Sequence, residues 1–212
     1  MAEKAGNFSA LMSLYSNDGD RKYLTQSERA RFYAALDTLG DTKARTFAET
    51  IYWTGCRPCE ALHLSPLQVD VDENVIIFRS AKKRGALKGR HYRPVPVPHS
   101  FMLRLDRIHN LQATRSHRSN GSDTRLWTFS RSTGWLLIRG VMQAAKLSGV
   151  KACARGLRHT YGVHAVLSGV PLPRIQFWMA HASMETTAVY LQLAGAEDRE
   201  IASRMWRETM AA

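Results

Sequence analysis

Hydrophobic side chains recur at helical spacing in the first quarter of the chain. Thr25 and Glu28 have the spacing of a capping box, and apolar residues follow at positions 32, 35, 36 and 39. This pattern predicts a helix over residues 25–40. A second helix is predicted over 41–53, with Gly55 as its stop signal.

The middle of the chain changes from helical to strand-like spacing. A short helix is predicted from Arg57 to about residue 65, because Pro58 suits a first helical turn. Residues 69–78 indicate two short strands around an Asp-Glu-Asn turn, and the prolines of 93–98 confine that extended segment to a sheet edge. Helical spacing then returns over residues 99–110, 132–147, 156–167, 173–179, 183–191 and 196–210.

These patterns predict an α+β fold that is mainly α-helical, with one small antiparallel three-stranded sheet. We expect an N-terminal tail over residues 1–20 and one domain over 21–212. A single domain of this size buries roughly 70% of its unfolded surface, so it needs no disulfide or metal to fold.

Composition narrows the class of protein. Of 212 residues, 44% are hydrophobic and 23% charged, which is typical of a globular chain and not of a disordered one. We find no apolar run of about 18 residues and no secretory signal pattern. The three cysteines form no disulfide framework. We therefore predict a cytoplasmic protein without membrane contact.

The charge is concentrated in one stretch of sequence. Residues 79–184 contain 19 Lys and Arg but only two acidic residues, within a chain whose net charge is +12. Such a segment repels itself unless it meets a polyanion, and nucleic acid is the commonest one. A solvated basic surface is the alternative, and an anionic membrane is less expected because no basic amphipathic helix stands out.

Breaking a phosphodiester bond requires a nucleophile, cations around the phosphate and an acid for the leaving oxygen. The basic segment has too few carboxylates for a two-metal site, so we predict no metal and no cofactor. Fixed cations with a protein nucleophile remain. Arg57 lies at a predicted helix start, Arg155 and Arg158 share one helical face, and His181 precedes Tyr190 by nine residues.

Four ordered sequence blocks resemble the tyrosine recombinases, also called phage-type integrases, over about residues 23–206. The first block, at residues 54–62, is similar to the family's TGxRxxEL pattern, and the second, at 156–160, to its second arginine block. Residues 179–190 resemble the LGH…TTxxY block. Lys82-Lys83 occupies the place of the family's β-hairpin lysine, and 93–96 resembles the RxVP strand that closes the hairpin.

The resemblance implies a role for each matching residue. Tyr190 would attack the scissile phosphate and form a 3′-phosphotyrosyl link. Arg57 and Arg158 would hold the non-bridging oxygens, and His181 would hydrogen-bond the phosphate or assist proton transfer. Residues 21–212 would then be the catalytic domain that breaks and rejoins DNA.

The resemblance also implies a lysine general acid for the departing 5′-hydroxyl. Lys82 is the first candidate, and the adjacent Lys83 is the alternative. The surrounding cations of the basic segment are predicted to bind DNA: Arg79, Lys83, Arg84, Lys88, Arg90 and Arg93.

One position departs from the family pattern. The family commonly has a histidine three residues before the second arginine, where this chain has Arg155. An arginine does not lose its proton, so it cannot accept one. Arg155 can still contact phosphate, and His181 or His159 is then the candidate for proton handling.

A second departure is length. The 20 residues before Arg21 are too few for the family's usual core-binding domain, and the layout resembles short single-domain members such as the fimbrial phase-switch invertases. The resemblance implies a tetramer on double-stranded DNA, with accessory DNA-bending proteins as candidate partners. Residues 196–212 are a candidate helix for docking on a neighbouring protomer.

These observations predict a site-specific DNA recombinase that integrates, inverts or resolves DNA. Two alternatives stay open: a type IB topoisomerase-like nicking–closing enzyme and a non-catalytic DNA-binding regulator on the same fold. The Cys56…Cys59 spacing imitates a redox motif, but the expected βαβ setting is missing from the pattern. Zinc would need a second Cys/His pair at a suitable spacing, which the sequence lacks.

Overall fold

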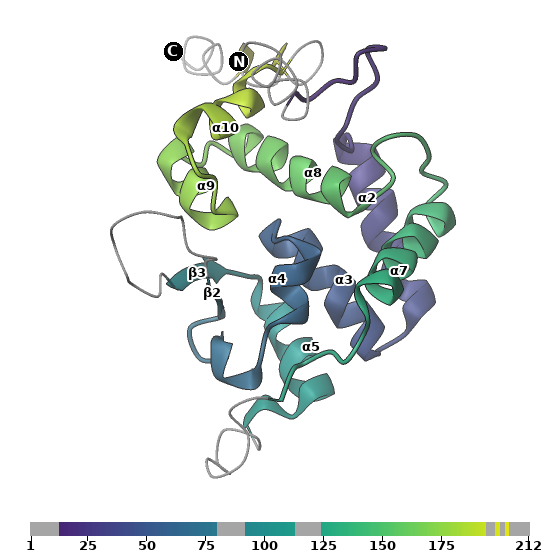
Figure 1. Cartoon of the computed structure of the whole chain (residues 1–212), viewed down its shortest axis with the longest axis vertical. Helices are drawn as coiled ribbons and strands as arrows, with labels where there is room; N and C mark the ends of the chain where they lie inside the picture. Colours follow the sequence, from purple (N-terminus) through teal and green to yellow (C-terminus); the bar gives the residue numbers. More distant parts are fainter. Residues whose placement is uncertain (1–12, 80–91, 113–123, 194–197, 200–201, 204–212) are drawn as a thin grey trace, which may run out of the picture.

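The computed structural model describes residues 13–79, 92–112, 124–193, 198–199 and 202–203. Its elements in chain order (Figure 1) are α2 (Gln26–Ala35), η1 (Leu36–Leu39), α3 (Lys43–Thr54), α4 (Pro58–Leu62), η2 (Pro66–Gln68), β1 (Val69–Asp70), β2 (Val75–Arg79), β3 (Tyr92–Pro96), α5 (His99–His109), α7 (Arg131–Ala144), α8 (Ala154–Leu167), α9 (Leu172–Met179), α10 (Met184–Ala188) and η3 (Val189–Leu191). The predicted class, mainly helical with one three-stranded antiparallel sheet, is confirmed.

The two predicted N-terminal helices are present. The Thr25 hydroxyl accepts from the Glu28 amide at 3.3 Å, and the Glu28 carboxylate accepts from the Thr25 amide at 3.0 Å, which confirms the capping box. The last turn before Gly40 is the 3₁₀ helix η1 and not a continuation of α2. Gly55 ends α3 in the left-handed conformation, with φ of 59°.

The sheet has the order β1-β2-β3, so β3 is an edge strand as predicted. Pro94 and Pro96 pair with Ile77 and Val75 of β2, and proline has no amide to donate. Side chains of β3 alternate between exposed and buried positions. This alternation turns Arg93 inward, toward the core.

Among the residues that the structure describes, two hydrophobic clusters stabilise the fold. The larger one joins α2, α3, α5, α7 and the sheet, and the smaller one joins α8, α9 and η3 to the N-terminal residues Leu14 and Tyr23. Leu14 lies within the predicted tail, yet its side chain is fully buried. The segment around Leu14, which precedes Arg21 in the sequence, therefore packs against the domain.

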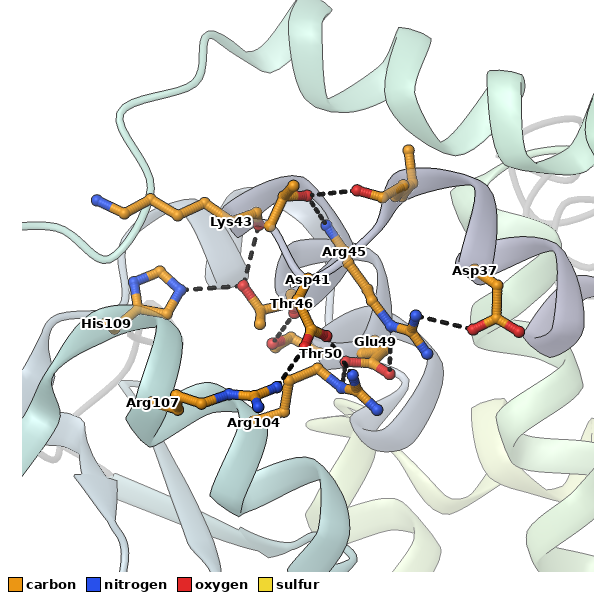
Figure 2. A network of polar contacts seen from close by, with 12 residues as sticks. Asp37, Asp41, Lys43, Arg45, Thr46, Glu49, Thr50, Arg104, Arg107 and His109 are labelled. Carbon is orange, nitrogen blue, oxygen red and sulfur yellow. Dashed lines mark hydrogen bonds and ion pairs between the residues drawn. The ribbon is translucent and has the colours of Figure 1, made fainter.

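A charged network fastens α3 to α5 (Figure 2). Glu49 of α3 is fully buried between Arg45 and Arg104, whose Nε atoms each lie 3.3 Å from a carboxylate oxygen. Asp41 extends the network by pairing with Arg104 and Arg107 of α5. The first arginine motif follows α3 directly, so this network anchors the helix that leads into it.

Two further observations concern the described part of the chain only. Within it, no helix combines the length and the apolar character needed to span a membrane. The helix predicted over residues 196–210 lies largely outside the described residues.

Candidate active site

The first arginine of the candidate site is presented by a turn between two helices. Arg57 is the N-cap of α4, and its backbone amide donates to the Glu60 carboxylate at 2.8 Å. Its guanidinium is 47% exposed and lies 3.1 Å from the same carboxylate. Gly55 permits this turn, because a Cβ there would lie 2.6 Å from the Tyr161 ring.

The second arginine joins three of the sequence blocks. Arg158 extends from α8, and one of its amino groups donates to the Gly55 carbonyl at 2.7 Å while the other donates to the Met179 carbonyl. These carbonyls lie two residues before Arg57 and His181. A guanidinium has five N–H donors, so these two bonds leave donors for a phosphate.

Burial also tunes the Arg158 guanidinium. Desolvation, followed by the nearby charge of Arg57, lowers the pKa of Arg158 to about 10. The group therefore remains protonated at neutral pH. Two cations held close to each other in a partly buried site favour an anion between them.

Tyr190 lies against α8 in the same region. Its side chain is 1% exposed, and a Cβ on Gly162 would lie 2.3 Å from its Cζ atom, so the ring occupies the space that a side chain would need. Burial raises the pKa of Tyr190 to about 12, while the charges of Arg158 and Arg57 act on it in the opposite direction. The phenol thus lies against α8, the helix that also carries Arg158.

Two histidine rings flank the phenol. The His181 ring stacks on Tyr190 with centroids 5.9 Å apart, and the His159 ring meets it edge-on at 6.1 Å. His181 Nδ1 lies 2.9 Å from the Thr187 hydroxyl, whereas the buried Nδ1 of His159 has no hydrogen-bond partner among the described residues. Burial, with Arg158 as the next cause, lowers the pKa of His181 to about 3 and that of His159 to about 4. Both rings are therefore neutral at physiological pH, and a pKa this low makes each of them a weak base.

The remaining predicted residues fall into three groups. Arg155 and Arg79 are exposed, at the start of α8 and the end of β2. Arg93 is 2% exposed and pairs with Glu60 at 3.1 Å, so the expectation that it contacts DNA is wrong for the side chain as it lies here. The others lie outside the described residues: Lys82, Lys83, Arg84, Lys88 and Arg90.

The sequence analysis assigned no role to three residues of the site, which are Glu60, Thr187 and Gly162. Glu60 and Thr187 stand inside the quoted motifs, which was a usable signal for a role. Gly162 carried no signal, because only the approach of Tyr190 shows why a glycine is needed there. Within the described residues, no three His, Cys, Asp or Glu side chains gather as a metal-binding group.

The family model described as the phage integrase family matches residues 22–197. Tyrosine recombinase XerA of Pyrococcus horikoshii is 24% identical over 185 residues, covering 84% of this chain and 59% of the relative. Tyrosine recombinase XerD of Xanthomonas axonopodis pv. citri is 26% identical over 186 residues, covering 82% of this chain and 59% of the relative. The chain thus spans about three fifths of the curated relatives it matches.

Solved structures show the same fold. The crystal structure of XerA recombinase matches 86% of this chain and 64% of that chain, with a TM-score of 0.69 and 25% identity. The catalytic domain of bacteriophage HP1 integrase matches 87% and 95%, with a TM-score of 0.56 and 19% identity. The family match covers most of the chain and every residue described above in the site, and the chain therefore belongs to the phage integrase family, the tyrosine recombinases.

Proposed function

We propose that this chain is a site-specific DNA recombinase in which Tyr190 attacks the scissile phosphate. The observation that carries the proposal is geometric: Arg158 donates to the carbonyls two residues before Arg57 and two residues before His181, and the His181 ring stacks on Tyr190. A cation pair beside a phenol suits a phosphodiester whose negative charge grows in the transition state.

The reaction balances as a transesterification. The Tyr190 oxygen forms a bond to phosphorus, the bond from phosphorus to the 5′-oxygen breaks, and the product is a 3′-phosphotyrosyl link with a free 5′-hydroxyl. The phosphodiester energy is conserved, so attack by another 5′-hydroxyl reseals the strand. No high-energy cofactor is needed. Lys82, with Lys83 as the alternative, remains the proposed acid, on the family resemblance alone.

The tyrosine proton needs an acceptor, because the pKa of Tyr190 is raised to about 12. Arg155 cannot serve, since it stays protonated. We assign the role to the two rings that lie beside the phenol, with His181 first and His159 second, on their position and not on their basicity. Arg155 is proposed to contact the DNA backbone from its exposed position at the start of α8.

Double-stranded DNA is the proposed partner. Its support is the excess of cations over residues 79–184 and the solved structure of a similar fold, XerH recombinase, bound to its difH substrate. Assembly as a tetramer, accessory DNA-bending proteins and docking of residues 196–212 on a neighbouring protomer are parts of the same proposal.

The first prediction concerns the nucleophile. A nicked suicide duplex, selected from a randomised pool by binding to the protein, should yield a covalent protein–DNA band on a denaturing gel. Tyr190→Phe should abolish that band and preserve binding, since it removes only the attacking oxygen. An adduct formed by the phenylalanine variant would show that another residue attacks, and binding without any adduct in the natural protein would favour a non-catalytic regulator.

The second prediction concerns Arg57. Arg57→Ala should slow adduct formation by about 10²–10³-fold, the range typical for losing one electrostatic donor. Duplex affinity, measured by titration, should change little because many other cations contact the backbone. Equal losses in rate and affinity would make Arg57 a binding residue. Relaxation of a supercoiled plasmid without a selected site would favour the nicking–closing alternative.

A further inference from the structure

Arg93 is a buried cation that the proposed reaction does not use directly. It lies on β3 with 2% of its side chain exposed, and its guanidinium carbon is 4.8 Å from the centroid of the Phe78 ring. Its two amino groups donate to the two oxygens of Glu60, at 3.4 and 3.1 Å. An arginine held in this two-pronged way has little freedom to turn toward solvent.

Glu60 is shared between two arginines. The oxygen that accepts from Arg93 at 3.4 Å also accepts from the Arg57 guanidinium at 3.1 Å. The other oxygen accepts from the Arg57 backbone amide at 2.8 Å. Burial alone would raise the pKa of Glu60, but the charge and hydrogen bonds of Arg93, with the Arg57 amide, hold it below its usual value. The carboxylate is therefore ionised at neutral pH.

Three charged groups meet here: the negative Glu60 carboxylate and the positive guanidinium groups of Arg57 and Arg93. With only Arg57 beside it, an ionised Glu60 would form a neutral pair and compete with a phosphate for that guanidinium. Arg93 neutralises Glu60 from the buried side, so the three groups keep one net positive charge. Arg57 is the exposed member, so the net positive charge lies at the surface and not in the core.

We propose that Arg93, acting through Glu60, positions Arg57 and keeps its charge available to the scissile phosphate. Arg93 is thus a positioning residue that couples the edge strand β3 to the first arginine block. The inference rests on the proposed function, because it concerns the same phosphate.

The test compares two variants that each remove one cation. Arg93→Met should slow adduct formation on the selected suicide duplex by about 10- to 100-fold, which is less than or equal to the typical loss of a direct donor. Its duplex affinity should change little. Arg31→Met is the matched control, since Arg31 is an exposed cation of α2 that donates to the Ala145 carbonyl and lies outside the basic segment of residues 79–184; it should change neither quantity. Arg93→Lys keeps the positive charge but loses the two-pronged contact. Its rate of adduct formation should lie between the rates of Arg93→Met and the natural protein.

A structural role and a positioning role differ in their dependence on Arg57. In an Arg57→Ala background, Arg93→Met should have almost no further effect, because the group that it positions is gone. On a duplex with a neutral methylphosphonate at the cleavage position, the Arg93→Met defect should also shrink. An equal defect in both backgrounds, or on both duplexes, would overturn the inference. If the natural protein forms no adduct at all, the proposed function fails instead.

Discussion

At the residue scale, the position of the nucleophile depends on a side chain that is absent. Gly162 lies in the middle of α8, where glycine costs up to about 1 kcal/mol relative to alanine. The Tyr190 ring occupies the place of its missing Cβ, which would lie 2.3 Å from the ring. The helix therefore accepts a weak helix former so that the phenol can pack against its backbone.

This geometry predicts opposite results at two helical glycines. Gly162→Ala should lower the free energy of unfolding by about 1–3 kcal/mol, as overpacking does, and should slow adduct formation because the ring is displaced. Gly140→Ala, on the exposed side of α7 with nothing within 4 Å of a new Cβ, should raise stability by about 0.5–1 kcal/mol. Urea unfolding and the gel assay measure both. If the two variants changed stability and adduct formation alike, the Tyr190 ring would not approach Gly162 as closely as the structure shows.

At Ala180, a residue with a side chain occupies a backbone position that suits glycine. It ends α9 in the left-handed conformation, with φ of 50°, immediately before His181. The family block that this segment resembles has glycine at that position, and glycine adopts this conformation without steric cost. The residue differs from the family, but the backbone still turns so that His181 reaches Tyr190.

At the scale of elements, packing decides which face of a helix is buried. Trp135 of α7 belongs to an apolar run of the sequence, but its side chain is 48% exposed. The buried face of α7 instead begins at Gly134, where a Cβ would meet the Phe47 ring at 3.0 Å, and continues through Ile138 and Val141. A small residue faces inward because a ring from α3 fills its space.

The junction between α3 and α5 allows a test of buried charge. Glu49→Gln leaves Arg45 and Arg104 without their shared anion, and breaking a buried pair costs about 3–5 kcal/mol. Asp37→Asn is the control, because Asp37 pairs with Arg45 at 2.8 Å but is 74% exposed, and exposed pairs contribute about 0–1 kcal/mol. Denaturant midpoints give both values. Comparable losses would mean that the network is hydrated throughout.

At the scale of the whole molecule, two buried histidines, His159 and His181, and two half-buried ones, His109 and His164, link stability to pH. Burial is the largest cause in each case, and it lowers the pKa of His109, His159 and His164 to about 4 and of His181 to about 3, from 6.5. Between these values and 6.5 the unfolded chain binds more protons than the folded one. The stabilisation is therefore complete above pH 6.5 and decreases as the pH falls below it.

We expect the urea midpoint to be clearly lower at pH 5 than at pH 7. Glu49 opposes this trend, because burial raises its pKa, but it is one group against four. His164→Gln should shrink the difference between the two pH values, since it removes one of the titrating groups. A midpoint that is equal at both pH values, or higher at pH 5, would show that these rings are hydrated in the folded protein.

The sequence by itself determined the local features: the capping box at Thr25, the stop at Gly55, the edge strand and the order of the motif blocks. These depend on interactions within a few residues, such as amides satisfied by a nearby side chain. Only the tertiary structure decided that Arg93 turns inward to Glu60, 33 residues away, and that Arg158 binds the Gly55 carbonyl across 103 residues. Burial and pairing between distant segments depend on how the whole core packs, and an arginine in a sequence looks the same whether it will face DNA or a buried carboxylate.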